Sequence, residues 1–335
     1  MIELQRHWWP LAELAELEAG RPVARTLHGV PLVLFRDADG RPAVLHDRCP
    51  HRHAPLSCGR IRQGEIACPY HGWRFAADGR CTDVPGMDYA ASRTPLVPAL
   101  AVRIAHGLVW ACAAPETGMA EPVAPAVTED VDAFFMTGTV LCELGEAAEN
   151  LLDGFHTHFE HAGWIRRDSK RQTVTAEVRR LADGIEARYS DEGLQSGLIS
   201  SLFEGSRSES FGRFRLPGVA EIEYRGKRGL NLLITAWLTP ETESRLRLHA
   251  RVATRRGLVP AWLKRVFLRR LFGIILRQDK TILEQTRANI MRFDASLPQV
   301  PLLDTPLDLL GPSIRRLLAG ECLDESVERV LISRI

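Results

Sequence analysis

Hydrophobic and polar positions alternate in short runs along the first third of the chain. From about Val23 to Trp110 these runs are separated by Asp-Gly and Pro-Gly turns, as in PLVLFRDADGRPAVLHD, GRCTDVPG and LAVRIAHGLVWAC. Alternation with a period of two is typical of strands with one buried face, and such dipeptides are typical of the turns between strands. Helical periodicity is nearly absent. We therefore predict a small all-β domain in this region.

The pattern changes after a Pro- and Ala-rich segment from Ala114 to Val127. Alternating runs beyond it predict further strands, and segments of helical periodicity occur among them. These strand-like runs are VTAEVRRLADGIEARYS, AEIEYRG, LNLLITAWLTP and RLRLHARVATRR. We therefore predict a second, α+β domain and place the boundary so that the domains comprise residues 1–117 and 118–335.

Composition agrees with two domains and excludes some partners. The chain has 335 residues, 45% of them hydrophobic, and a net charge of +1, which indicates no polyanionic partner such as a nucleic acid. Its seven cysteines form no dense framework, and the N-terminal MIELQRHWWP lacks a signal-peptide pattern. We expect a protein of the reducing cytoplasm.

The most apolar long stretch, Gly257 to Leu276, is interrupted by the charges of Lys264, Arg265, Arg269 and Arg270. We therefore predict no transmembrane segment. A basic, apolar helix of this kind could rest on a membrane surface. A core helix with a solvated basic face is the interpretation that we prefer.

Two short motifs, Cys49-Pro-His51 and Cys68-Pro-Tyr-His71, are separated by sixteen residues. In a Rieske [2Fe-2S] cluster two Cys hold one iron and two His hold the other, which raises the reduction potential. Zinc is the alternative, but zinc sites normally place the two Cys in one short pair and the two His in another. Here each motif supplies one Cys and one His. The spacing therefore favours the cluster.

The stretch from Asp47 to Trp73, which contains both motifs, closely resembles the cluster domain of the Rieske non-heme iron oxygenases. Respiratory Rieske proteins carry an extra disulfide with a Cys between the second pair of ligands, where this chain has Tyr70. The resemblance implies an α+β protein with two parts. An N-terminal all-β domain holds the cluster, and a C-terminal helix-grip (START-like) antiparallel sheet with helices carries a mononuclear iron. The implied cluster ligands are Cys49, His51, Cys68 and His71.

A second cluster of His and carboxylate residues, ENLLDGFHTHFEH, begins at Glu149 and opens what we interpret as a helix. Two His and one carboxylate on one face of Fe(II) leave positions open for O2 and substrate. Helical spacing alone does not select the pair. Asp153 and His156 share a face, as do His158 and His161, whereas His156 and His161 are about 140° apart on an ideal helix.

The resemblance selects the pair, because the oxygenase pattern Asp-x-x-His-x-x-x-x-His falls on Asp153, His156 and His161. It implies that both His bind the mononuclear iron. It also implies that Asp153 hydrogen-bonds to His156 and to the cluster ligand His71 of the partner subunit, which would link the two metal centres. The alternative is that Asp153 simply orients a ligating His. His158 is expected to be a structural or supporting residue, and its role and that of Glu149 stay open.

The third iron ligand should be a carboxylate far along the chain, and Asp279 in ILRQDKTILEQ is the candidate. It falls on the apolar stripe of a helix, together with Leu271, Ile275, Ile282 and Leu283. Burial of an unpaired carboxylate is costly, and metal binding would explain the position. The alternative is an ion pair with Arg277 or Arg287. Glu284 lies about 140° away on the helix and is the weaker candidate.

The resemblance implies the terminal oxygenase component of a Rieske system. The chain has no Gly-x-Gly-x-x-Gly fingerprint, so its electrons should come from a separate NAD(P)H-dependent reductase or ferredoxin. It also implies a head-to-tail homotrimer, in which one subunit's cluster lies beside the next subunit's iron.

The substrate is predicted only by its polarity. Pocket walls should come from the sheet and from a loop from Ser196 to Pro217. Apolar segments such as GLISSLF and GLNLLITAWL favour a hydrophobic or aromatic small molecule, and the alternative is that these residues form the core. Chain length and the lack of an evident small-subunit partner favour hydroxylation or demethylation. Three alternatives stay open: a cis-dihydroxylating dioxygenase, an electron carrier that uses only the cluster, and a Rieske protein that binds a ligand without oxygenating it.

Overall fold

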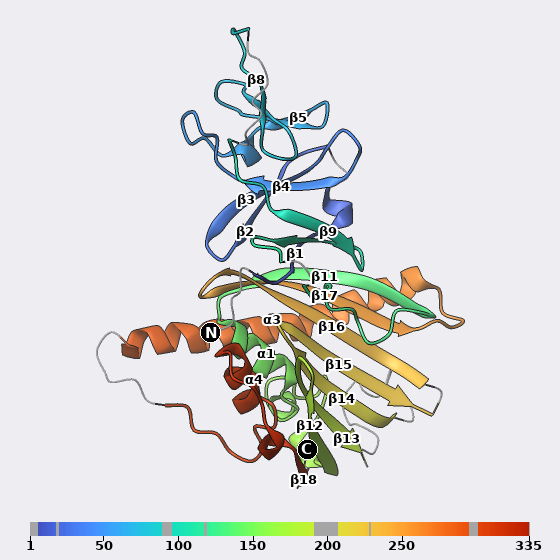
Figure 1. Cartoon of the computed structure of the whole chain (residues 1–335). Coiled ribbons are helices and arrows are strands. Elements are labelled where there is room, and N and C mark those ends of the chain that lie inside the picture. The colour runs from blue at the N-terminus through green and yellow to red at the C-terminus, as the bar shows by residue number, and fades with distance from the viewer. Residues whose placement is uncertain are drawn as a thin grey trace. The chain divides into compact units, whose positions relative to one another are not determined.

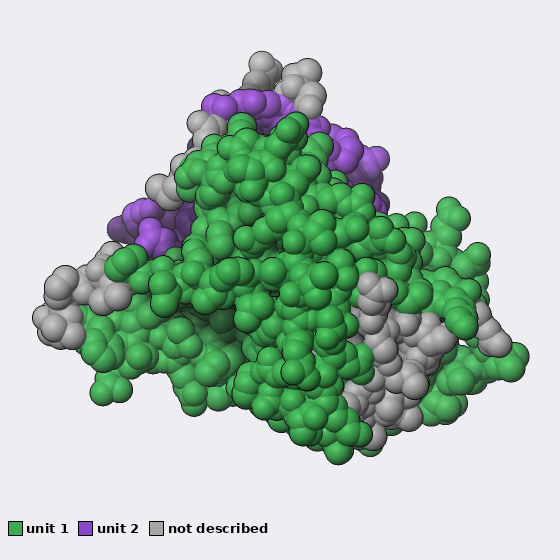
Figure 2. Space-filling model, turned by 90° about the horizontal axis from the view of Figure 1, so that it is seen from below, with its two compact units in different colours: residues 1–2, 125–238, 244–335 green, residues 3–124, 239–243 purple. Residues whose placement is uncertain are grey.

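The computed structural model describes residues 6–17, 20–88, 96–116, 119–190, 207–227, 229–294 and 301–334 (Figure 1). The chain divides into two compact units, coloured in Figure 2. The N-terminal unit comprises residues 3–124 and 239–243, and the C-terminal unit comprises residues 125–238 and 244–335. The boundary predicted between residues 117 and 118 lies outside the described ranges and stays a prediction.

The N-terminal unit consists of three small antiparallel sheets. In spatial order their strands are β1 (Trp9–Glu13), β10 (Leu108–Cys112) and β9 (Ala101–Ala105); β2 (Val23–Leu27), β3 (Val30–Arg36) and β4 (Pro42–His46); and β5 (Arg60–Arg62), β6 (Glu65–Ala67), β7 (Arg74–Phe75) and β8 (Cys81–Asp83). The short 3-10 segments η2 (Leu14–Leu17) and η3 (Leu56–Cys58) complete it. The prediction of a small all-β region is confirmed.

The central strands of this unit are buried on both faces, which simple alternation does not predict. In β3 the four residues from Leu32 to Phe35 are all buried, and so are all five residues of β10. Each of these strands lies in the middle of its three-stranded sheet and is covered on both sides, as a continuous hydrophobic run requires.

The C-terminal unit is built on one eight-stranded sheet (Figure 1). The strands, in spatial order, are β11 (Val131–Val140), β17 (Arg245–Arg255), β16 (Gly229–Thr242), β15 (Val219–Gly226), β14 (Arg207–Arg215), β13 (Gly184–Ser190), β12 (Thr173–Leu181) and β18 (Arg329–Arg334). The predicted α+β class is confirmed. Part of the loop predicted from Ser196 to Pro217 is strand β14, and residues 196–206 of that loop, with the GLISSLF segment, lie outside the described residues.

Helices α1 (Leu144–Leu152), α3 (Ala261–Asp294) and α4 (Gly311–Leu318) cover one face of this sheet (Figure 1). The 3-10 segments η4 (His156–His158), η5 (Asp168–Lys170) and η6 (Glu325–Val327) lie in the connections. Side chains from the sheet and helices form one core, exemplified by Ala148, Ile314, Ala187, Phe214 and Ala236. The sheet thus forms one side of the core, and the helices place polar residues next to it.

The long helix α3 contains most of the apolar stretch from Gly257 to Leu276, because the helix begins at Ala261. It buries Leu268 and Phe272 against the sheet, whereas Trp262, Val266 and Phe267 of the same helix are exposed. Within the ranges that the structure describes, no helix is both long enough and apolar enough to cross a membrane.

Candidate metal centres

Helix α1 ends beside the first candidate site. A capping box of Glu143 and Glu146 begins the helix, and Asp153, in extended conformation, follows its last residue. The Asp153 carboxylate accepts the backbone N–H groups of Phe155 (2.7 Å) and His156 (3.2 Å), which turns the chain away from the helix axis. The helix predicted to run through His161 is therefore wrong. The angle of about 140° between His156 and His161 on one helix does not apply.

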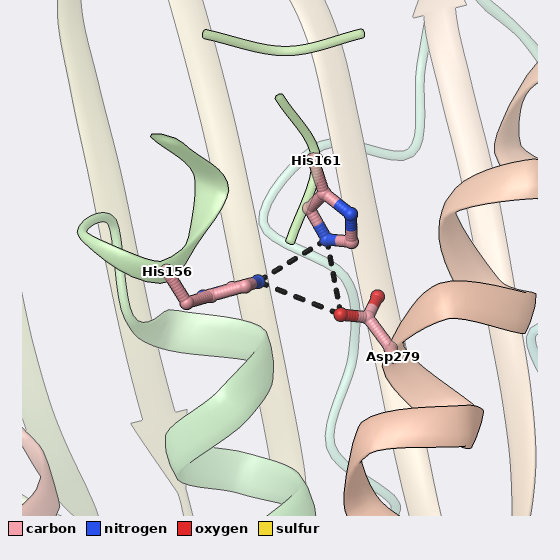
Figure 3. Close-up of side chains that lie close together, drawn as sticks. All are labelled: His156, His161 and Asp279. Atoms are coloured by element: carbon pink, nitrogen blue, oxygen red, sulfur yellow. Dashed lines mark hydrogen bonds and ion pairs between the residues drawn. The ribbon is translucent and has the colours of Figure 1, made fainter. Parts of the chain in front are cut away.

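Three side chains from two distant segments meet after this turn (Figure 3). His156 Nε2 and His161 Nε2 are 3.2 Å apart and lie 3.5 Å and 3.0 Å from Asp279 Oδ1 on α3. Each residue offers a ligand atom within 4.8 Å of the others, a grouping that no other His, Cys, Asp or Glu of the described residues forms. His161 and Asp279 are buried.

Polar groups behind the two imidazoles orient them. His161 Nδ1 lies 3.1 Å from the amide Oε1 of Gln278, so that Nδ1–H can donate to this oxygen and leave the Nε2 lone pair for a metal. His156 Nδ1 lies 3.5 Å from Asp153 Oδ2, which is long for a hydrogen bond but close enough for an ion pair. A carbonyl or carboxylate oxygen in this position is usual for metal-ligating His.

The electrostatics of the group suit a bound cation. Burial opposes charge on His156, but Asp153 and Asp279 raise its pKa to about 9. Burial also opposes charge on Asp279, but the neighbouring imidazoles hold the pKa of its carboxyl below the ordinary value. Asp279 Oδ1 is buried and makes no hydrogen bond of good geometry within the described residues. Two imidazole nitrogens and a carboxylate oxygen around one point fit Fe(II) and leave one side open.

The open side faces a cavity of about 130 Å³, which we call the substrate cavity. Its walls are mainly apolar, from Ile222, Leu232, Ile234 and Val252 of the sheet and Phe272 and Ile275 of α3. A few polar groups also line it, among them Asn150, Tyr189, Ser210 and Tyr224, and the buried Arg166, whose Nη1 donates to Gly154 O at 2.7 Å. An apolar space with a few fixed polar groups is typical of a small-molecule site.

The other residues that we considered for this site lie elsewhere. Arg287 pairs with Glu143 at 2.6 Å rather than with Asp279, and Glu284 Oε1 accepts the Leu141 N–H at 3.2 Å. Glu149 pairs with Arg315, and burial raises the pKa of its carboxyl.

His158 is also separate from the three-residue group, although its side chain is buried. Its ring Nδ1 lies 3.3 Å from Phe155 O. Sequence reasoning missed Gln278, whose only signal is its place next to Asp279.

The second candidate site lies on two tight loops of the N-terminal unit. In the first loop, Cys49 N–H donates to Ala54 O and His53 N–H donates to Cys49 O, both at 2.9 Å. Asp47 closes this loop by accepting the Ser57 N–H (2.7 Å) and hydroxyl (2.5 Å).

In the second loop, Cys68 N–H donates to Trp73 O at 2.8 Å and Gly72 N–H donates to Cys68 O at 3.1 Å. Gly72 has φ +77°, a conformation that favours glycine. Both cysteines therefore sit on backbone turns of fixed shape.

The four predicted cluster ligands divide by burial. Cys49 and Cys68 are buried in the core of the unit with Leu56, Ile66 and Phe75, and burial raises the pKa of the Cys49 thiol to about 11. His51 and His71 are exposed, with ring centroids 4.6 Å apart, and His51 stacks on Trp73 at 4.9 Å. The loops thus present two thiols inward and two imidazoles outward.

The spread of these four ligands bears on the zinc alternative. A tetrahedral zinc has Zn–S and Zn–N distances of about 2.0–2.3 Å, so its donors lie within about 4 Å of one another. All four residues are described, yet their ligand atoms do not form a compact group of the kind that His156, His161 and Asp279 form. Such spacing suits a two-iron cluster, in which thiolates and imidazoles bind different irons.

Comparison with protein families assigns most of the chain. Residues 7–98 match the Rieske [2Fe-2S] domain, and residues 140–321 match the vanillate O-demethylase oxygenase C-terminal domain. The oxygenase component of chloroacetanilide N-alkylformylase from Rhizorhabdus wittichii is 35% identical over 261 residues, which are 72% of this chain and 74% of that protein.

Shorter matches include two O-demethylase components. The 5,5'-dehydrodivanillate O-demethylase oxygenase subunit of Sphingobium sp. is 33% identical over 49% of this chain and 40% of that subunit. The oxygenase component of dicamba O-demethylase from Stenotrophomonas maltophilia is 34% identical over 49% of this chain and 50% of that protein. The matches to several such curated relatives thus span only a quarter to a half of their length.

Among solved structures, dicamba monooxygenase bound to dicamba superposes with a TM-score of 0.78. The alignment covers 95% of this chain and 97% of that one at 23% sequence identity. This likeness shows that the fold is shared.

Proposed function

This chain belongs to the Rieske oxygenases that carry a vanillate O-demethylase-type C-terminal domain, and from that premise we propose that it is the terminal oxygenase component of a multicomponent system. It would use O2 and electrons from a separate NAD(P)H-dependent reductase or ferredoxin to hydroxylate or demethylate a hydrophobic or aromatic small molecule. The observation that carries this proposal is the convergence of His156, His161 and Asp279 on an apolar cavity.

We assign the [2Fe-2S] cluster to Cys49, His51, Cys68 and His71, and the mononuclear Fe(II) to His156, His161 and Asp279. When bound, the cluster supplies one-electron transfer and the iron supplies the oxygen chemistry. The chain's own residues hold the metals and orient their ligands and the substrate. Gln278 fixes the ring of His161, Asp153 lies behind His156, and the apolar walls place the substrate and keep water away.

We assign Asp153 to the link between the centres of neighbouring subunits in a homotrimer. Its side chain is 41% exposed, yet one carboxylate oxygen lies 3.5 Å from His156 Nδ1. An exposed carboxylate next to an iron ligand can accept a hydrogen bond from His71 of the partner subunit. Asp153→Asn should keep both metals but slow electron transfer from the cluster, as single-turnover absorbance would measure. Light scattering of the same samples tests the trimer.

The substrate cavity supports a substrate whose reacting part is about one ring in size. Its volume of about 130 Å³ is close to the ~150 Å³ of an apolar cavity that holds benzene. Relatives named as O-demethylases and an N-alkylformylase favour removal of a carbon substituent. Relatives named as phthalate 4,5-dioxygenase and phenoxybenzoate dioxygenase keep ring dihydroxylation as the second candidate.

The remaining expectations are proposals of the same kind. None of the seven cysteines forms a disulfide within the described residues, which supports a reducing compartment such as the cytoplasm. The domains 1–117 and 118–335 are proposed as the cluster domain and the catalytic domain. An electron carrier without oxygenase activity would leave the group at Asp279 without a role.

The function can be tested by O2 uptake with a surrogate reductase and a panel of single-ring methyl ethers and N-alkyl anilides. Demethylation releases formaldehyde in proportion to the O2 consumed, whereas ring dihydroxylation consumes O2 without formaldehyde. His156→Ala should abolish both signals and keep the cluster spectrum. Continued product formation by His156→Ala would refute the assigned site.

A further inference from the structure

A second cavity, of about 190 Å³, lies in the C-terminal unit between β11, α1 and α3, and we call it the side cavity. All of its lining residues are described. Most of the lining is apolar and comes from Val140, Ala147, Leu151, Leu238, Leu248, Leu276 and Leu283. Its polar residues are Asp279 and Asn150, which it shares with the substrate cavity, and Thr137, Thr139, Arg277 and Lys280.

The side cavity and the substrate cavity share five lining residues, and one of them, Asp279, belongs to the metal group. Both are lined by Asn150, Leu151, Leu248, Leu276 and Asp279. The inner end of the side cavity is therefore lined by Asp279, the residue that we assign to the iron. A small molecule there would reach the metal without passing through the substrate cavity.

The other end of the side cavity lies at Gly138 on β11, which has no side chain to fill it. Alternation along the strand places Gly138 on the same face as the buried Phe134 and Met136. Gly138 pairs in register with Leu248, and a Cβ built on it would meet no atom within 4 Å. Gly138 is nevertheless exposed, so the space in front of it connects to the surface.

The backbone does not explain this glycine. Its φ is not in the left-handed region, so another residue could adopt the same conformation. Glycine weakens a strand interior and often marks a place that must stay open to a ligand or to another chain segment. Lys280 Nζ donates to Thr139 O at 2.9 Å and ties α3 to β11 next to the opening. The opening is thus held between two fixed elements.

We propose that the side cavity is a separate entry route for molecular oxygen, leading from Gly138 to Asp279. The proposal rests on the proposed oxygenase function. O2 is small and apolar, so it can enter an apolar channel. A charged or strongly polar cosubstrate would gain little from such a channel. A substrate in the substrate cavity would block that approach to the metal, whereas the side cavity would still admit O2.

Xenon tests the route without any turnover, because apolar cavities bind xenon. Crystals of the metal-loaded protein under xenon pressure should show a xenon atom in the side cavity. A graded series, Gly138→Ala, Gly138→Val and Gly138→Phe, should lower its occupancy as the side chain grows. Ala133→Val, on the opposite face of the same strand, is the matched control and should keep the xenon. A side cavity without xenon in the wild-type protein would overturn the proposal.

Nitric oxide, a diatomic gas like O2, tests whether the route reaches the metal. Stopped-flow absorbance of Fe(II)-loaded protein should show association at least about tenfold slower in Gly138→Phe and intermediate in Gly138→Val, with Ala133→Val unchanged. Iron and sulfide contents confirm that each variant is loaded. Equal association rates across the loaded series would overturn the route. A wild-type protein that retains its cluster but binds no nitric oxide would instead contradict the proposed iron site.

Discussion

The two candidate metal centres are held in different ways. The proposed cluster ligands lie within the 23 residues from Cys49 to His71, on loops closed by their own backbone hydrogen bonds. The proposed iron ligands come from the segment after α1 and from α3, more than a hundred residues apart, and they meet through packing on the sheet. The first site is therefore a property of local chain conformation, and the second is a property of the assembled fold.

The difference extends to electrostatics. The cluster site places two thiols in an apolar core, where burial raises the pKa of Cys49 to about 11, so a metal must displace protons to bind there. The iron site already contains the carboxylate Asp279 next to the two imidazoles, and it keeps one side open to a cavity. The first site combines buried thiols with exposed imidazoles, whereas the second leaves room for reactants.

Removal of one proposed ligand from each site should have the largest effects, and the first such change is made at the cluster site. Cys68→Ser should eliminate the visible absorbance of the cluster completely and leave the mononuclear iron in place, because the two sites share no residue. Cys58→Ser, at an exposed cysteine of the same unit, should leave the absorbance unchanged. Loss of both metals in Cys68→Ser would show that the sites depend on each other.

The reciprocal change is His161→Ala, which removes a buried imidazole from the iron site. Turnover should fall to background and the cluster absorbance should stay at the wild-type level. Glu284→Gln on α3 is the control, because Glu284 accepts the Leu141 N–H and is not part of the metal group. The assignment fails if His161→Ala retains substantial turnover at normal iron content.

A smaller effect is expected when a supporting residue is changed. Gln278→Leu removes the oxygen that lies 3.1 Å from His161 Nδ1, and Fe(II) affinity should fall by about 10- to 100-fold. Competitive metal titration measures the affinity. Gln285→Leu, at an exposed position of the same helix, should not change it. Equal affinities would mean that packing alone orients His161.

The smallest effects concern backbone conformation. Gly72→Ala should lower the free energy of unfolding by about 1 kcal/mol, because φ at Gly72 is +77° and alanine disfavours that region. Gly273→Ala, inside α3 with no atom within 4 Å of the added Cβ, should raise it by up to about 1 kcal/mol. Chemical denaturation of the metal-loaded variants measures both. Effects of the same sign would contradict the local control that we ascribe to the cluster loops.

The cluster site could be predicted from the sequence more completely than the iron site, for physical reasons. The cluster motif could be read from spacing because its ligands are local. Asp279 became a candidate because a charge on an apolar helical stripe needs a partner, and the family resemblance favoured a metal over an Arg as that partner. The helix predicted through His161 was wrong, because the carboxylate of Asp153 takes the N–H groups of Phe155 and His156 and ends the helical course.

Features made by distant contacts could not be predicted. Gln278 supports His161 only because α3 packs beside the segment after α1. The side cavity is lined by Gly138 and by its strand partner Leu248, a residue 110 positions later in the chain. Neither contact leaves a pattern in the sequence.

The proposed oxygenase needs a second metal site apart from its cluster. Iron and acid-labile sulfide should be measured per chain on anaerobically purified protein, for the wild type and for Asp279→Ala. We expect about three irons to two sulfides in the wild type and about two to two in the variant. A wild-type ratio of about two to two that persists after reconstitution with Fe(II) would contradict the claim and indicate an electron carrier.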